Sequence, residues 1–201
     1  MDIRIIYALL AGYIIGNFSP AYILVRIIKK GDIRNFGSGN AGMANTNRVL
    51  GFKWALLVFA LDALKGVAAV LVGRLFFGEI GGLIGGLGAV IGHNWPVVLG
   101  FHGGKGVATS AGVAMALSLI TFGILLGVFI LVVAVWRYMS LGSIMVGILL
   151  PLSLLIFGNP VREILLGIIL AAMILFQHRA NIQRLLTGSE RKLSINPSGG
   201  A

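Results

Sequence analysis

The sequence predicts an all-α integral membrane protein: one domain, residues 1–197, built as a bundle of seven transmembrane helices. Composition is the first observation, because 58% of the 201 residues are hydrophobic and 11% are charged, too few to cover a soluble domain. The second is that polar residues gather in short intervals between apolar stretches long enough to cross a bilayer. The third is that basic residues concentrate in alternate intervals, as they do in cytoplasmic loops.

Composition also limits the chemistry. The chain has no cysteine, which excludes disulfides, thiol catalysis and zinc-thiolate sites. No metal or other cofactor is expected. The net charge of +10 fits basic loops facing anionic lipid better than nucleic-acid binding. The final Ser-Gly-Gly-Ala, residues 198–201, is interpreted as an expression remnant.

The first apolar span, residues 3–28, is interrupted near Pro20. Proline removes a helical hydrogen bond, so a kink is expected there. Asn17 and Ser19 lie beside it, and in lipid such side chains more often join helices than bind ligands.

The second span, residues 52–76, contains two charged residues inside an apolar segment. Asp62 and Lys65 have i, i+3 spacing, so they share a helix face and can pair. Charge within a span indicates either a functional site or a self-neutralising pair that fixes helix packing, and both interpretations stay open.

Five further spans complete the count. After a turn at Gly78-Glu79, residues 80–90 carry five glycines that favour close helix packing. Residues 107–136 are too long for one span and are expected to form two helices that turn at Thr121-Phe122-Gly123. The last two spans are residues 141–157 and 161–176.

Seven spans place the N-terminus outside and the C-terminus in the cytoplasm, and the basic residues support this orientation. The intervals assigned to the inside contain Arg26, Lys29, Lys30, Arg34, Arg48, Lys53, Lys105, Arg137, Arg179, Arg184, Arg191 and Lys192, against Arg4, Arg74 and Arg162 outside. Three polar segments then face the cytoplasm: residues 31–52, the loop around Lys105 and the tail from His178.

The loop around Lys105 has the composition of an anion site. Gly103, Gly104 and Gly106 can adopt positive φ and turn successive N–H groups toward one anion, while Lys105 adds a full charge. It is not a Walker A loop, because Leu99 stands where that motif needs glycine. From this loop alone, phosphate binding and a plain interhelical turn are equally good interpretations.

The other two polar segments offer further groups for a polyanion. Within residues 31–52, the candidates are Ser38, Asn40, Asn45 and Arg48, with a plain flexible loop as the alternative. In the tail, a continuing helix would put His178, Asn181 and Leu185 on one face, with headgroup anchoring as the alternative.

The three segments together resemble the motifs of a known family. They read Gly37-Ser38-Gly39-Asn40-Ala41-Gly42 with Asn45 and Arg48; Gly92-His93 with Pro96 through Gly103-Gly104-Lys105-Gly106; and His178-Arg179 with Asn181-Ile182, Arg184-Leu185, Gly188 and Glu190. In these residues the chain resembles the bacterial acyl-phosphate:glycerol-3-phosphate acyltransferases, the PlsY family, over nearly its whole length. Met43-Ala44 departs from the usual pair ending in Thr, so a role for that hydroxyl is not carried over.

The resemblance implies a bacterial inner-membrane enzyme of phospholipid synthesis with its active site at the cytoplasmic face. It would transfer a fatty acyl group from acyl phosphate to the sn-1 hydroxyl of glycerol 3-phosphate, releasing lysophosphatidic acid and phosphate. Its expected partners are glycerol 3-phosphate, fatty acyl phosphate and membrane lipid, and a monomer is compatible with this activity. The donor is a mixed anhydride, so cations and N–H groups suffice to receive the charge of the leaving phosphate.

The resemblance also implies roles for residues. The expected catalytic set is Ser38, Asn40, Arg48, Lys105, His178 and Asn181. The expected phosphate-binding set is Gly39, Asn45, His93, Gly103, Gly104, Gly106 and Glu190. His178 and Asn181 are expected near the acyl carbonyl or the attacking hydroxyl. The proton acceptor stays open between His93, His178 and the substrate's own phosphate. A covalent intermediate on Ser38 is the weaker alternative, since no base adjoins it.

The sequence also bears on two other classes of protein. Acyltransferases of the other main class carry a His followed, after four residues, by Asp; here Val98, Val107 and Gln183 stand at that position after His93, His102 and His178, which excludes that mechanism. A membrane transporter of phosphate or an organophosphate is the remaining alternative, with Asp62 and Lys65 lining its path.

Overall fold

The computed structural model describes residues 2–193, and across these residues the chain forms nine α-helices and two short 3-10 helices. The all-α prediction is confirmed. Contacts divide the described residues into two compact units, 2–113 and 114–193. Residues 198–201, interpreted above as an expression remnant, lie outside the described range.

The predicted interruption of the first apolar span near Pro20 is confirmed, and it divides the span into two helices. Helix α1 (Ile3–Asn17) ends before the break, and α2 (Pro20–Lys29) begins with Pro20 at its first position, where the missing N–H is tolerated. Ser19 caps α2 by accepting a hydrogen bond from the backbone N of Tyr22.

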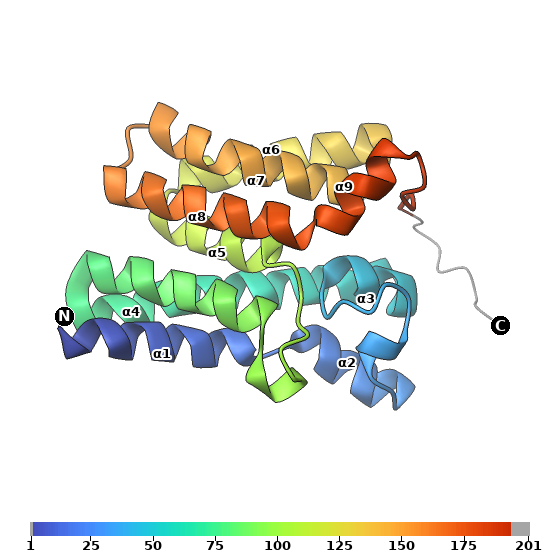
Figure 1. The fold of residues 1–201 in the computed structure, drawn as a ribbon, viewed down its shortest axis with the longest axis horizontal. Coiled ribbons are helices and arrows are strands. Elements are labelled where there is room, and N and C mark those ends of the chain that lie inside the picture. Colours follow the sequence, from blue (N-terminus) through green and yellow to red (C-terminus); the bar gives the residue numbers. More distant parts are fainter. Residues whose placement is uncertain (1, 194–201) are drawn as a thin grey trace. The chain divides into compact units, whose positions relative to one another are not determined.

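Helix α4 (Phe52–Asn94) reverses direction part of the way along. Phe77 and Gly78 have non-helical backbone angles, and Gly78 has φ of 55°, so this is the turn predicted near Gly78. The second half packs directly on α1, since a Cβ added at Gly12 would lie 2.0 Å from the carbonyl oxygen of Gly85. Figure 1 shows α1 running alongside this part of α4.

The polar interval between the first two spans is folded rather than an open loop. It contains η1 (Ile33–Asn35) and α3 (Met43–Leu50). Ile33 is completely buried in an apolar cluster with Val25 and Val58, which the polar composition of the segment did not indicate. This anchor fixes the first motif to α2 and α4.

Beyond α4, η2 (Val97–Leu99) leads into α5 (Val107–Leu117), and α6 (Leu119–Trp136) follows after a single residue. The expected pair of helices is present, but the predicted turn at Thr121-Phe122-Gly123 is wrong. The break lies at Ser118, whose side chain accepts a hydrogen bond from the backbone N of Thr121 and caps α6.

The second unit contains α6, α7 (Met139–Ile156), α8 (Val161–Gln177) and α9 (Arg179–Leu186), with α7 packed between α6 and α8 (Figure 1). Ser153 on α7 donates a hydrogen bond to Thr121 on α6, a polar bridge between apolar helices. The tail does continue as a helix, bent by 60° between α8 and α9.

Four described helical segments are long and apolar enough to span a membrane, and five if the bent pair α8 and α9 counts as one span. The segment from Phe52 includes the reversal at Phe77-Gly78 and is counted once, whereas α5 is an apolar helix of 11 residues. A multi-pass helical membrane protein is therefore established, while the count of seven spans and the orientation of the termini stay predictions.

Candidate active site

The first two motifs meet in the first unit. The backbone N of Ala41 donates to the carbonyl of Gly103 at 3.3 Å, joining two segments that are far apart in the sequence. The approach is close, because a Cβ added at Gly104 would lie 3.0 Å from the carbonyl oxygen of Ala41. Two of the three predicted polar segments are thus in direct backbone contact.

Asn45 organises the first motif internally. Its side-chain oxygen accepts from the backbone N of Ser38 at 2.8 Å, and its amide nitrogen donates to the carbonyls of Ile33 and Phe36. Asn45 is 1% exposed, and these bonds occupy both ends of the amide. The contacts therefore favour a structural role over the phosphate-binding role expected from the sequence. Gly39, with φ of 75°, completes the turn that presents Ser38.

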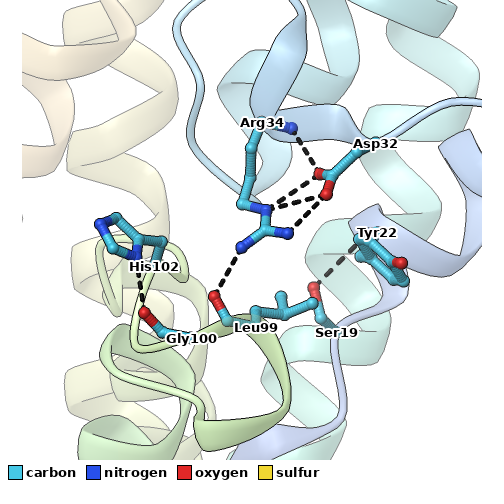
Figure 2. Close-up of polar contacts among 7 residues, drawn as sticks. All are labelled: Ser19, Tyr22, Asp32, Arg34, Leu99, Gly100 and His102. Carbon is cyan, nitrogen blue, oxygen red and sulfur yellow. Dashed lines mark hydrogen bonds and ion pairs between the residues drawn. The ribbon is translucent and has the colours of Figure 1, made fainter.

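Arg34 fastens the two motifs together, which the sequence did not indicate. Figure 2 shows its guanidinium between the carboxylate of Asp32 and the carbonyl of Leu99, to which Nη1 donates at 2.6 Å. Nε donates to both carboxylate oxygens of Asp32 at 3.0 Å. The hydrogen bonds from Arg34 hold the pKa of Asp32 below its usual range, although burial acts in the opposite direction.

A polar hollow of about 370 Å³ opens where these segments meet. It is lined by Asp32, Arg34, Asn35, Gly39 and His102. The hollow therefore adjoins both Gly39 of the first motif and the residue that precedes Gly103 in the second.

The glycines beside Lys105 serve different purposes. The N–H groups of Gly103 and Gly104 donate to the carbonyls of Asn94 and His93 at 3.2 and 3.0 Å. These two N–H groups are therefore bonded to the last residues of α4, which corrects the expectation that they would face an anion. Gly106 does have positive φ, 80°, and stands directly before α5. The groups of this loop that can still meet an anion, as the sequence predicts, are Lys105, Gly106 and the first turn of α5.

The remaining predicted groups of the first unit lie on the same segments. Arg48 lies in the last turn of α3, while Asn40 donates from its side chain to the carbonyl of Ser38 at 3.3 Å. Ser38 is exposed, whereas Lys105 and Arg48 are partly buried. The unit thus supplies two cations, one hydroxyl and one amide from joined segments.

Beneath the loop lies a buried charge cluster that includes the predicted pair. The Nζ atom of Lys65 is 2.7 Å from Oδ1 of Asp62, so the i, i+3 pairing is confirmed. It is also 2.7 Å from Nδ1 of His93, a contact that the sequence did not reveal. The reversal of α4 brings His93 back beside the pair.

The third motif is built in the second unit around Glu190. The carboxylate accepts hydrogen bonds from Ser140 Oγ and Asn181 Nδ2 at 2.8 Å and from Arg184 Nε at 2.7 Å. Burial alone would raise the pKa of Glu190, but these hydrogen bonds outweigh it and lower the pKa. An ionised carboxylate bonded in this way repels phosphate, so the contacts of Glu190 favour a role in orienting Asn181 rather than binding an anion.

His178 begins the bend before α9 and is 3% exposed. Its Nδ1 lies 2.8 Å from the carbonyl of Ile174. A carbonyl only accepts, so Nδ1 carries the proton, and in the neutral ring Nε2 is the accepting nitrogen. The geometry at His93 is the reverse, because the ammonium of Lys65 only donates and Nδ1 must accept.

Together, a helical membrane fold and polar loops rich in cations define a class: integral membrane proteins that handle an anionic substrate. A family model described as glycerol-3-phosphate acyltransferase matches residues 6–188. The chain belongs to this family, the PlsY acyltransferases, as the resemblance in its three motifs predicted.

Individual relatives agree over nearly full length. A glycerol-3-phosphate acyltransferase of Thermoanaerobacter pseudethanolicus is 50% identical over 181 residues, covering 90% of this chain and 91% of the relative. One of Clostridioides difficile is 46% identical over 196 residues, with 94% and 95% covered. These names favour the enzyme over the transporter alternative.

Solved structures of PlsY, an integral membrane glycerol 3-phosphate acyltransferase, share the fold. Its glycerol 3-phosphate form is 38% identical, with a TM-score of 0.87 and coverage of 94% of this chain and 96% of that one. Its lysophosphatidic acid form is 37% identical, with a TM-score of 0.85 and coverage of 95% and 96%.

Proposed function

We propose that this acyltransferase takes its acyl group from a fatty acyl phosphate and transfers it to the sn-1 hydroxyl of glycerol 3-phosphate. The hydroxyl oxygen bonds to the acyl carbon, the bond from that carbon to the anhydride oxygen breaks, and phosphate leaves with the electron pair. The products are lysophosphatidic acid and inorganic phosphate. The relative has been solved in a glycerol 3-phosphate form and in a lysophosphatidic acid form, and these two molecules are one substrate and one product of this reaction.

One observation carries the proposal: the Ala41 to Gly103 hydrogen bond joins a segment carrying Arg48 to a segment carrying Lys105. Donor and acceptor each carry a phosphate, and both must be held close for transfer. Arg48 offers a planar fork of N–H donors, while Lys105 offers a compact charge beside the N-terminus of α5. We assign phosphate binding to these two cations, Gly106 and the first N–H groups of α5.

In this proposal the third motif contributes His178 and Asn181 to the transfer, as the sequence predicts. Asn181 is oriented by Glu190, and His178 presents Nε2 as an acceptor because Nδ1 donates to Ile174. Of the two histidines considered as proton acceptors, we favour His178, since the neutral His178 ring carries its proton on Nδ1, whereas the neutral His93 ring carries its proton on Nε2. The substrate's own phosphate stays the alternative acceptor.

We further propose the membrane arrangement that the sequence predicts. Counting the two halves of α4 separately and α5 as a short span gives seven crossings, with the motifs at the cytoplasmic face of the bacterial inner membrane. The acyl chain would then enter from the bilayer while glycerol 3-phosphate arrives from the cytoplasm.

The test is phosphate release from palmitoyl phosphate by purified protein in detergent, with and without glycerol 3-phosphate. Release that depends on the acceptor and yields lysophosphatidic acid is expected. Lys105→Ala and Arg48→Ala should each lower kcat/KM by about 10²–10³, the usual effect of removing a group that stabilises developing charge. Lys53→Ala, which removes an exposed cation in the first turn of α4, is the matched control and should retain activity. Folded wild-type protein that releases no phosphate would refute the proposal.

A further inference from the structure

The charge cluster of Asp62, Lys65 and His93 lies outside the groups assigned to substrate. All three side chains are buried, with residue exposures of 1%, 5% and 6%. Charges placed in the low-dielectric interior of a membrane protein are costly unless each is paired, and removing one partner is strongly destabilising. The arrangement of partners therefore indicates what the cluster does.

Lys65 donates hydrogen bonds to backbone carbonyls at the break in the first span. In an unbroken helix the carbonyl of Gly16 would accept from residue 20, but Pro20 has no N–H. Lys65 Nζ instead lies 3.2 Å from the carbonyl oxygen of Gly16 and 2.8 Å from that of Phe18. One ammonium thus replaces the hydrogen bonds that the break removes and ties α1 to α4.

The same ammonium orients His93. It lies 2.7 Å from Nδ1, while Asp62 Oδ1 is 3.4 Å from that nitrogen, beyond the usual range of an N–H···O bond. Lys65 is therefore the donor and Asp62 neutralises it from the other side at 2.7 Å. The imidazole is held with Nδ1 toward the cluster and Nε2 away from it.

The far edge of that ring supports the loop that carries Lys105. A Cβ added at Gly104 would lie 2.2 Å from Nε2 and 2.7 Å from Cε1 of His93, so ring and backbone are in direct contact. The carbonyl of His93 also accepts from the N–H of Gly104. The next residue along the chain is Lys105.

We propose that Asp62, Lys65 and His93 are positioning residues: the ion pair fixes the His93 ring, and the ring fixes the Gly103-Gly104 backbone so that Lys105 meets the substrate phosphate. This inference rests on the proposed function. It resolves the two interpretations of the Asp62 and Lys65 pair by giving the pair a role in substrate binding through His93, beyond holding helices together.

His93→Asn is the discriminating variant. The Asn side-chain oxygen can still accept from Lys65 in place of Nδ1, but the shorter amide lacks the ring edge that contacts Gly104. We expect the KM for glycerol 3-phosphate to rise at least about tenfold, as for a displaced binding group, with the thermal midpoint close to that of the wild type. Hydrogen exchange at the Gly104 amide should accelerate by a similar factor.

Two further variants separate the effect of an unpaired buried charge from the effect of losing the contact that orients His93. Lys65→Met leaves Asp62 buried without its cation and should lose both stability and activity. Combining it with Asp62→Asn removes both charges while keeping the side-chain sizes. This protein should recover the part of the stability that the unpaired charge costs, although the carbonyls of Gly16 and Phe18 still lack their donor, and it should retain the raised KM. Glu79→Gln, at the half-exposed ion pair with Arg74, is the control and should leave KM unchanged.

The outcomes are distinct. A selective rise in the KM for glycerol 3-phosphate in folded His93→Asn supports the proposal. Wild-type kinetics in that variant, or loss of activity only in proportion to unfolded protein, overturns it, as does failure of both His93→Asn and the double variant to fold. A wild type that acylates no glycerol 3-phosphate would instead refute the proposed function.

Discussion

Glu190→Gln is expected to destabilise the second unit and to remove part of the pH dependence of its unfolding free energy. The carboxylate of Glu190 accepts from Ser140, Asn181 and Arg184 and has 4% of its side chain exposed. Glutamine keeps one oxygen for Ser140 and Asn181, both of which bond to Oε1. It loses the charge that faces Arg184 and places an amide N–H donor opposite a guanidinium that also only donates.

The magnitude follows from that one lost interaction. A hydrogen bond to a charged group contributes about 1.5–3 kcal/mol, and the 43% exposure of the Arg184 side chain reduces this, so we expect a loss of about 1–2 kcal/mol. For a chain of this size the thermal midpoint should fall by about 2–8 °C. Activity should fall as well, because Asn181 loses its charged partner.

The dependence on pH provides the sharper test. The pKa of Glu190 is lowered in the folded protein from its usual value of 4.5, so the carboxylate stabilises the fold above that value and this contribution is lost as the pH falls through the folded pKa. The difference in unfolding free energy between wild type and Glu190→Gln should therefore be full at pH 7 and vanish in acid. Thermal unfolding in detergent across this range measures it. A difference that stays constant with pH would refute the reasoning.

Gly104→Ala places a methyl group 2.2 Å from His93 Nε2 and should raise the KM for glycerol 3-phosphate at least about tenfold in steady-state kinetics. Arg34→Met breaks the bond to the carbonyl of Leu99 and the pair with its neighbouring carboxylate, and should lower the free energy of unfolding by about 1–2 kcal/mol in thermal melts. Asn45→Ala removes three hydrogen bonds between a buried side chain and backbone groups, and should lower that free energy by about 2–4 kcal/mol.

Each of these variants has a matched control. Gly123→Ala, a helical glycine with no atom within 4 Å of an added Cβ among the described residues, should match the wild type in KM. Arg34→Lys keeps a cation for Asp32 and should lose less stability than methionine, while Asn45→Asp keeps an acceptor for the Ser38 N–H. Equal effects of Arg34→Lys and Arg34→Met, or an Asn45→Ala protein as stable as the wild type, would contradict the assigned contacts.

Properties that depend on local composition were predicted from the sequence. Apolar spans follow hydropathy, so helices at residues 52–76, 141–157 and 161–176 were located closely, and the i, i+3 spacing of Asp62 and Lys65 was enough to pair them. The three motifs were sufficient to identify the family.

Features that depend on long-range contact were missed. His93 joins the pair only because α4 reverses at Phe77-Gly78, and no spacing rule connects residues 28 apart. Arg34 was assigned only to an inward loop, because its partner is a backbone carbonyl, which has no sequence signature. The same reason hid the structural role of Asn45, whose partners are all main-chain groups.

The contact between α1 and the second half of α4 also restricts where lipid can pass. Added Cβ atoms at Gly12, Gly16, Gly88 and Gly92 would all lie within 2.5 Å of a carbonyl oxygen on the facing helix. Backbone meets backbone along this seam, leaving no gap as wide as a methylene group. A fatty acyl chain therefore cannot pass between α1 and the second half of α4. In the proposed reaction, the acyl donor would therefore enter by another route.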